Sequence, residues 1–363
     1  MKIHSPRQLL AVIPHMLGFS PDSSLVCIAL VDEEIDVILR MDTAEAISTA
    51  EAISTADAIN AAVAVEATEH VADLTHESGT KNHYTSKVVT PLAETLEKFR
   101  LNLASLSNPQ VVVVAYATHD IGRTDLNTVE DELEGFEVLD LLLVTGTHWR
   151  SLMCEDASCC PEQGHELDLD IEDSAVQFVL QGSAPFESRQ HMSDSLVPIT
   201  LDQEQRGLQE EAFLAQIQIP TTVANRANVG QLCDVLARGS QLSWSEVAQV
   251  SVQLRDFHYR DALLRLLLDD AKGRLAVRSG LCDVLRRTQT RWVAPVATTL
   301  AGCAWLDGNG ALARMAVDRA LESDPEYSLA RLLDRALTHG VPPRVWAESL
   351  AAVSFDECAQ GAA

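Results

Sequence analysis

Apolar runs in the first half of the chain predict β-strands. Residues 24–31 and 35–40 are dominated by aliphatic side chains, and three acidic residues separate the two runs. Two β-favouring runs joined by so short a polar link indicate an antiparallel hairpin. Residues 111–115 and 139–145 are further, mainly apolar runs of the length expected for strands in the middle of a sheet.

A helix is predicted between the hairpin and the third strand. Leu92, Leu96, Phe99 and Leu103 recur at spacings of four, three and four residues, which places them on one face of a helix. Strands interrupted by a helix favour a layered α/β domain. We therefore expect residues 1–200 to form an α/β domain with a mixed sheet, a β-hairpin and packing helices.

From about residue 201 the pattern predicts helices only. Ser243 and Glu246 have the spacing of a capping box at a helix start, and Asp256 and Arg260 are spaced to meet on one helix face. Breakers such as Asp-Pro and Pro-Pro separate further helices, expected over residues 292–305, 310–322, 327–338 and 344–353. We expect residues 201–363 to form an all-helical domain.

One pair of these helices has tetratricopeptide-like spacing. Leu300, Ala301, Ala313, Ala320 and Pro325 match the positions at which small residues let two antiparallel helices approach closely. Because a peptide-binding solenoid needs about three repeats, the single match favours a helical domain that packs in this way.

Residues 43–60 contain three copies of a hexapeptide, TAEAIS twice and TADAIN once. A six-residue period at about 100° per residue turns Ile47, Ile53 and Ile59 to three different sides of a helix, so no apolar face forms. With the polar residues that follow, we interpret residues 43–87 as a low-complexity repeat insertion and loop.

The charge balance argues against two classes of partner. The 363 residues contain 27 Lys and Arg against 53 Asp and Glu, a net charge of −26. Binding to nucleic acid or to an anionic membrane requires clustered cations, so neither partner is expected. No apolar stretch has the length of a transmembrane helix, and no apolar signal region is visible near the N-terminus. We expect this acidic protein to be cytoplasmic.

Three of the eight cysteines form a cluster between two histidines. The cluster and its flanking histidines are His148, Cys154, Cys159, Cys160 and His165. Sulfur and imidazole ligands of this kind bind zinc, and the sixteen Asp and Glu against two Arg in residues 120–175 would attract a divalent cation. The adjacent cysteines depart from the usual zinc spacing, however. The sequence favours reduced thiols in an ordered loop, with a zinc site and a labile disulfide as alternatives, and it implies no other cofactor.

Polar side chains near the ends of predicted strands are candidates for a ligand site. Arg40 and Asp42 end the second strand, and Trp149 and Arg150 directly follow the fourth, where an indole can stack on a ligand. Structural ion pairs and packing at a rim are the competing interpretations. The candidate ligand-binding residues are His15, Arg40, Asp42, Trp149, Arg150 and Arg189. No catalytic residue is assigned.

His15 also precedes Asp22, Ser23 and Ser24, but the order of elements argues against a catalytic serine here. A nucleophilic serine usually occupies a sharp strand-to-helix turn. In this segment a helix comes first, Gly18 ends it, and a strand begins at Ser24. We interpret the segment as a helix, its cap and a turn.

Several segments together resemble a known family. They are SPRQLLAVIPHMLGFSPDSSLV at 5–26, WRSLMC at 149–154 with CCP at 159–161, GSAP at 182–185 with Ser188 and Arg189, and AWLDGNGALA at 304–313 continuing to DPEYSLARLL at 324–333. This set resembles the actinobacterial family known as Domain of Unknown Function 4192. The resemblance implies a single inherited architecture in a cytoplasmic actinobacterial protein, and it implies no mechanism.

The sequence favours a non-catalytic binding or scaffolding protein that engages a protein partner through the helical half or the acidic cysteine loop. The alternative is an enzyme of undetermined reaction, with or without a metal, whose polar site lies near the strand ends. Gly-rich phosphate loops, dinucleotide fingerprints and His-Glu-x-x-His motifs are absent from the sequence. Convergence of His15, Arg40, Asp42, Arg150 and Arg189 in one pocket would favour the enzyme, and dispersal the binding protein. The oligomeric state and the identity of any partner are left open.

Overall fold

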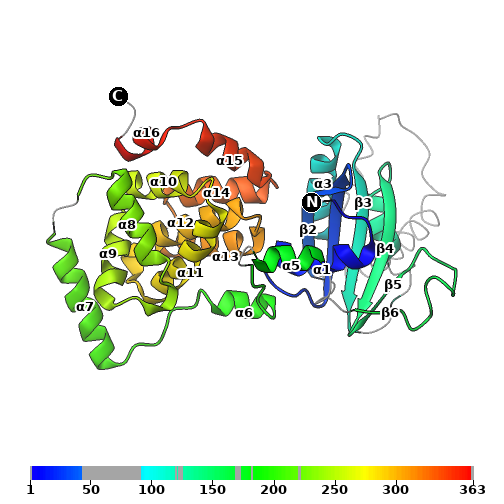
Figure 1. Ribbon diagram of the computed structural model, residues 1–363, viewed down its shortest axis with the longest axis horizontal. Coiled ribbons are helices and arrows are strands. Elements are labelled where there is room, and N and C mark those ends of the chain that lie inside the picture. The colour runs from blue at the N-terminus through cyan, green and yellow to red at the C-terminus, as the bar shows by residue number, and fades with distance from the viewer. Residues whose placement is uncertain are drawn as a thin grey trace, which may run out of the picture. The chain divides into compact units, whose positions relative to one another are not determined.

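The computed structural model describes residues 2–42, 91–118, 121, 126–167, 173–180, 183–219 and 222–360. The chain forms two compact units (Figure 1). The sheet unit comprises residues 1–6 and 22–168, and the helical unit comprises residues 7–21 and 169–363. The boundary predicted near residue 200 therefore differs from this division. The proposed insertion at 43–87 lies outside the described residues.

The sheet unit is built on a mixed six-stranded sheet with the strand order β2-β1-β3-β4-β5-β6. Its strands are β1 (Ser24–Val31), β2 (Glu34–Asp42), β3 (Gln110–Ala117), β4 (Glu137–Thr145), β5 (His148–Ser151) and β6 (His165–Glu166). Only β3 and β4 pair in parallel, and every other pairing is antiparallel. The predicted hairpin is confirmed as β1 and β2. Asp32 and Glu33 at its turn both have positive φ, 52° and 69°, the backbone twist that suits a tight hairpin.

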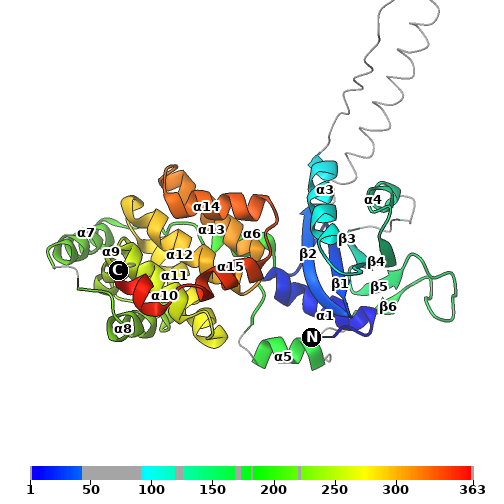
Figure 2. The same ribbon diagram turned by 90° about the horizontal axis from the view of Figure 1, so that it is seen from above.

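Two helices of the sheet unit cover one face of the sheet (Figure 2). They are α3 (Pro91–Ala104) and α4 (Asn127–Glu132). Side chains alternate along each strand, so one residue in two from β1, β3 and β4 points toward these helices. The buried core on this face includes Leu25, Cys27, Ala29, Leu96, Phe99, Leu103, Val111, Val113, Ala115, Val129, Leu133, Leu141 and Leu143. Leu96, Phe99 and Leu103 lie on the predicted apolar face of α3.

The helical unit surrounds one central helix. Its helices are α1 (Pro6–Leu17, from Arg7 onward), α5 (Asp173–Leu180), α6 (Arg189–Asp194), α7 (Gln203–Ile217), α8 (Arg226–Leu236), α9 (Trp244–Leu254), α10 (Phe257–Leu266), α11 (Ala271–Arg287), α12 (Val293–Leu306), α13 (Gly310–Ser323), α14 (Ser328–Thr338), α15 (Pro343–Ala351) and α16 (Phe355–Gln360). Every residue of α12 except Leu306 is buried, because α9, α10, α11, α13, α14 and α15 all pack against it (Figure 1). The predicted tetratricopeptide-like pair is α12 and α13, where Leu300, Ala301, Ala313 and Ala320 are buried.

Of two contacts predicted near helix starts, one is confirmed and the other is wrong. Ser243 and Glu246 form the expected capping box of α9, each side chain accepting a hydrogen bond from the other's backbone N–H. The predicted Asp256–Arg260 pair is wrong, because α10 begins at Phe257 and Asp256 is its N-cap, accepting from the His258 N–H at 3.0 Å. Arg260 instead donates to the neighbouring Asp261 at 2.8 Å. A cap residue turns its side chain back onto the first free N–H groups and is thereby unavailable to the next turn.

No helix within the described part of the chain is long and apolar enough to span a bilayer.

Candidate functional site

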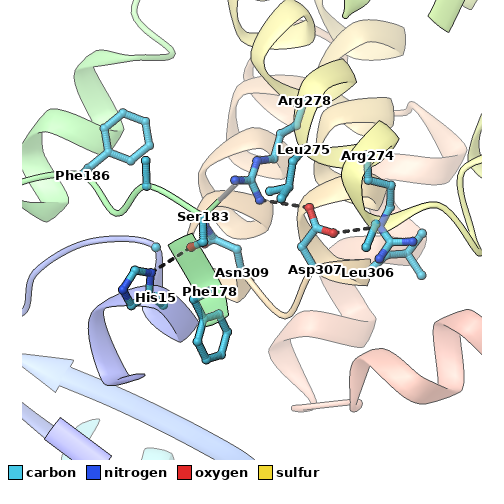
Figure 3. Close-up of a pocket in the computed structure, with 13 residues that line it drawn as sticks. His15, Phe178, Ser183, Phe186, Arg274, Leu275, Arg278, Leu306, Asp307 and Asn309 are labelled. Atoms are coloured by element: carbon cyan, nitrogen blue, oxygen red, sulfur yellow. Dashed lines mark hydrogen bonds and ion pairs between the residues drawn. The ribbon is translucent and has the colours of Figure 1, made fainter. Parts of the chain in front are cut away.

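A pocket of about 230 Å³ lies in the helical unit and is lined by four segments that are far apart in the sequence (Figure 3). We call it the arginine pocket. Its lining consists of His15 and Gly18 at the end of α1, Phe178, Ser183, Ala184 and Phe186 around the end of α5, Ala271, Arg274, Leu275 and Arg278 on α11, and Leu306, Asp307 and Asn309 between α12 and α13.

The end of α1 is fastened to this pocket by backbone contacts. Gly18 accepts a hydrogen bond from the Phe186 N–H at 2.8 Å, and the Ser20 N–H donates to the Phe186 carbonyl at 2.9 Å. Gly18 has a φ of +81°, and a Cβ added there would lie 2.0 Å from Nδ2 of Asn309. Only glycine therefore satisfies both the left-handed turn and the close approach.

Two arginines share one carboxylate on the far side of the pocket. Arg274 donates from Nε to Asp307 at 2.8 Å, and Arg278 donates from Nη1 to the other oxygen of Asp307 at 3.0 Å. Arg274 also donates to the carbonyls of Leu267 and Leu268, at 2.7 and 2.5 Å. These bonds engage Arg274 within the fold, whereas Nε and Nη2 of Arg278 have no partner among the described residues. The three side chains sum to one positive charge in a chain whose net charge is −26.

The opposite side of the pocket carries neutral polar groups. His15 Nδ1 lies 3.1 Å from the Ser183 hydroxyl, and the imidazole stacks on Phe178 with 5.3 Å between ring centroids. Burial lowers the pKa of His15, so the ring is neutral at neutral pH.

Asn309 completes the polar lining and is only 5% exposed. Its Oδ1 accepts from the Leu312 N–H at 2.9 Å and thereby caps α13. Its Nδ2 has no hydrogen-bond acceptor in the part of the chain that the structure describes. Because Asn309 lines the pocket, its Nδ2 can donate to the oxygen of a water molecule or of a ligand there.

These groups together suit a small molecule with an anionic end. Nε and Nη2 of Arg278 and Nδ2 of Asn309 are donors without an acceptor among the described residues, and Phe178, Phe186 and Leu275 add apolar surface to the same lining (Figure 3). The volume is below the roughly 300–1,000 Å³ typical of pockets for drug-sized ligands. The pocket therefore fits a compact ligand of metabolite size.

The residues selected from the sequence do not gather at one place. Arg40 and Asp42 lie on β2, where Arg40 donates to Asp42 at 2.5 Å and to Ser24 at 2.8 Å. Trp149 and Arg150 lie on β5, and three strands stand between β2 and β5. At about 4.8 Å per strand the two pairs are roughly 19 Å apart across the sheet.

The two remaining candidates belong to the helical unit. His15 lines the arginine pocket. Arg189 is an exposed residue at the start of α6, and the Ser188 side chain caps that helix. Arg189 does not line the pocket.

Sequence reasoning missed most of the pocket. The residues it did not select are Ser183, Arg274, Arg278, Asp307 and Asn309. One signal was available, because three of the segments that carry the family resemblance, at 5–26, 182–185 and 304–313, all contribute to the lining. Residue type alone does not separate Arg278 from the many other helix-borne arginines.

The cysteine cluster forms a second candidate site, in the loop between β5 and β6 of the sheet unit. The sulfur atoms of Cys154, Cys159 and Cys160 all lie within 4.8 Å of one another. The contacts of Cys159 with Cys154 and then with Cys160 raise the pKa of the Cys159 thiol. The three sulfur atoms are thus direct neighbours within one loop.

The flanking histidines do not join the sulfur atoms. His165 places Nε2 2.8 Å from the carbonyl of Cys159 and packs its ring on Trp149, with 4.8 Å between centroids. His148 lies on β5 with Nδ1 3.2 Å from the Thr147 hydroxyl. The structure thus brings three of the five predicted metal ligands together.

Comparison with known proteins adds a family assignment. No curated protein and no solved structure gives a significant match to this chain. A family model matches residues 6–344, a span that contains both the arginine pocket and the cysteine loop. The chain therefore belongs to the family described as Domain of unknown function (DUF4192).

Proposed function

We propose that this chain is a non-catalytic binding protein whose arginine pocket holds a small organic anion. The ligand class is a carboxylate or phosphate monoester with a compact apolar part. The observation that carries the proposal is a set of donors without an acceptor among the described residues, namely Nε and Nη2 of Arg278 and Nδ2 of Asn309, on two residues that line one small cavity. Charge-assisted hydrogen bonds from a guanidinium are the strongest common contacts to such anions.

The sign of the local charge supports an anion over a cation. Asp307 is the only acid among the described residues that line the pocket, and it is paired with two arginines, which leaves one excess positive charge. The carboxylate is 10% exposed, and so is Arg274. Arg274, Arg278 and Asp307 together carry one excess positive charge, and a ligand anion next to Arg278 would balance it.

The enzyme alternative has one observation in its favour. The 3.1 Å contact between His15 and Ser183 is within the range for a general base and a nucleophile. A catalytic dyad also needs a group that orients the base, and Nε2 of His15 has no hydrogen-bond partner among the described residues. The separation of Arg40 and Asp42 from Trp149 and Arg150 likewise supports a binding protein.

The test is calorimetric titration of the full chain with benzoate and with phenyl phosphate, using benzyl alcohol as the neutral probe. We expect both anions to bind and benzyl alcohol to bind at least about tenfold more weakly, since a hydrogen bond to a charged group contributes about 1.5–3 kcal/mol. Arg278→Gln should weaken anion binding about 10- to 100-fold. Arg335→Gln is the matched control, because Arg335 is an exposed arginine on α14 outside the pocket, and it should change nothing.

Two outcomes would contradict the proposal. One is equal binding of benzyl alcohol and the anions, or an equal loss in both arginine variants. The other is hydrolysis of a phenyl ester that disappears in Ser183→Ala while benzoate binding persists, which would favour the enzyme.

A protein partner on the helical unit is a second candidate function. Leu208, Leu214 and Ile217 on α7 are 45%, 60% and 44% exposed, and Phe213 is the one buried residue of that helix. A surface helix usually turns its large apolar residues toward a core or a partner. Exchanging Leu214 and Ile217 for Lys should abolish any protein association of the wild-type chain without lowering its thermal stability. Unchanged association would exclude this surface.

We also propose, from the family resemblance, that the chain acts in the cytoplasm of an actinobacterium.

A further inference from the structure

The cysteine loop is ordered without an apolar core of its own. In residues 152–167 every side chain is at least partly exposed. Hydrogen bonds hold the first part of the loop, since the Ser151 hydroxyl accepts from the backbone N–H groups of Met153 and Cys154 at 3.1 and 3.2 Å. Small segments that cannot bury apolar surface are commonly held by a metal or by disulfides.

The two ends of the loop are tied together. β5 and β6 pair through His148 with Glu166 and Trp149 with His165. Gly164 has a φ of +76°, and a Cβ there would lie 2.7 Å from the Trp149 carbonyl oxygen. The chain therefore returns against β5 just after the last cysteine, through a turn that favours glycine.

A backbone turn gathers the adjacent cysteines beside the first one. The Asp156 carbonyl accepts from the N–H groups of both Cys159 and Cys160, at 3.0 and 2.7 Å. This turn brings both sulfur atoms to within 4.8 Å of Cys154. In the sequence, the adjacency of Cys159 and Cys160 argued against a metal site. The structure removes this objection, because the sulfur atoms of both residues lie close to that of Cys154.

The sulfur separations are close to those of a metal site. Zinc–thiolate bonds of about 2.3 Å in a tetrahedral site set the sulfur atoms about 3.8 Å apart. The three sulfur atoms, all within 4.8 Å of one another, need to close by no more than about 1 Å. Small side-chain rotations in a loop without buried residues provide that movement.

We propose that Cys154, Cys159 and Cys160 bind one zinc ion as three thiolates, with the fourth position open to water. Sulfur donors select zinc and other thiophilic ions over magnesium or calcium. Each thiol gives its proton to solvent on binding, so one zinc ion replaces three protons and the site carries one negative charge. His165 is not a ligand in this proposal, since its Nε2 contacts the carbonyl of Cys159 and not the sulfur atoms.

This inference is independent of the arginine pocket. The test is elemental analysis of the full chain, expressed without an affinity tag, in the wild type and in Cys154→Ser, Cys159→Ser and Cys160→Ser. Cys358→Ser is the matched control, because Cys358 is a partly buried thiol of the helical unit outside the cluster. We expect about one equivalent of zinc in the wild type and in the control, and less than about a tenth of that in each cluster variant. Replacement of zinc by cobalt should give sulfur-to-cobalt charge-transfer absorption in the wild type and in Cys358→Ser, and in none of the three cluster variants.

Proteolysis supplies a readout that does not depend on metal counting. A glutamate-specific protease should cut at Glu155 and Glu162 at least tenfold faster after chelation, and equally fast in the cluster variants without chelation. The helical signal in circular dichroism should stay constant and so verify that the variants are folded. Metal-free wild-type protein with three titratable thiols, a disulfide within the cluster, or zinc loss that is equal in Cys358→Ser would each overturn the proposal.

Discussion

The two candidate sites of this protein are assembled in opposite ways. The arginine pocket draws its lining from four segments between His15 and Asn309, all within the helical unit. The cysteine cluster comes from one loop of the sheet unit, with seven residues from Cys154 to Cys160. The pocket contains buried ion pairs and a buried asparagine, whereas the loop buries no side chain.

This difference has an energetic consequence. A residue of the pocket touches several helices at once, so its replacement disturbs the packing of the whole unit. A residue of the loop touches its own neighbours, so its replacement is absorbed by local rearrangement. Changes in the pocket should therefore alter the free energy of unfolding. Changes in the loop should alter the metal content and the resistance of the loop to proteolysis, with little effect on the free energy of unfolding.

The largest effect is expected from Gly18→Ala in the arginine pocket. The new Cβ would lie 2.0 Å from Asn309 Nδ2, at a backbone φ of +81°. Left-handed backbone at a non-glycine residue costs about 1–3 kcal/mol, and steric overpacking costs a similar amount. We expect a loss of about 3 kcal/mol in urea unfolding followed by tryptophan fluorescence. Gly207→Ala on α7, where nothing lies within 4 Å, should instead stabilise the chain by about 0.5–1 kcal/mol. Equal effects of the two changes would contradict the packing described here.

Asp307→Asn should lower the free energy of unfolding and strengthen the binding of an anion in the arginine pocket. It leaves Arg274 and Arg278 without their carboxylate, and breaking a buried ion pair costs about 3–5 kcal/mol, reduced here because both arginines keep some exposure. We expect about 2–3 kcal/mol lower stability and tighter binding of benzoate, since the pocket gains net positive charge. Calorimetric titration under conditions where the variant is folded measures the second effect. Weaker benzoate binding in the folded variant would argue against an anion site.

Gly164→Ala provides the counterpart to Gly18→Ala in the cysteine loop. The strain is similar in kind, with a φ of +76° and a Cβ 2.7 Å from the Trp149 carbonyl. Because no side chain of the loop is buried, we expect the unfolding free energy to change by less than about 1 kcal/mol. Zinc content should nevertheless fall, as measured by elemental analysis. A loss of stability as large as that of Gly18→Ala would mean that the loop is part of a cooperative core.

The smallest effect is a pH dependence that depends on His15. Burial lowers the pKa of this imidazole below its ordinary value of 6.5, so the folded protein takes up fewer protons than the unfolded chain as the pH falls through that value. The contribution of His15 to stability is therefore complete above pH 6.5 and decreases below it. His15→Gln should flatten the dependence of the unfolding midpoint between about pH 7 and 5. A steeper dependence in the variant would show that the sign assigned to His15 is wrong.

The predictable parts of the fold are those that local patterns specify. The hairpin of β1 and β2, the apolar face of α3 and the capping box at Ser243 involve residues that are neighbours in sequence, so spacing identifies them. The Asp256–Arg260 prediction failed for a local reason, because one residue's difference in the helix start turned Asp256 into a cap. The three cysteines were found for the same reason that the hairpin was, since they lie within one short segment.

Sequence patterns were enough to predict an acidic protein with an α/β part followed by helices, four of the six strands, and the cysteine cluster. The short strands β5 and β6 and the short helices α4, α5 and α6 were not predicted. Long-range packing, which the sequence does not reveal, keeps the flanking histidines apart from the sulfur atoms, brings His15 to Ser183 and not to Ser24, and places Arg278 and Asn309 in the lining of one pocket. Side-chain periodicity and helix capping act over a few residues, whereas a pocket forms where helices that are remote in the chain pack together. The contacts that decide that packing, such as Gly18 against Asn309, join residues whose spacing in the sequence carries no information about their distance in space.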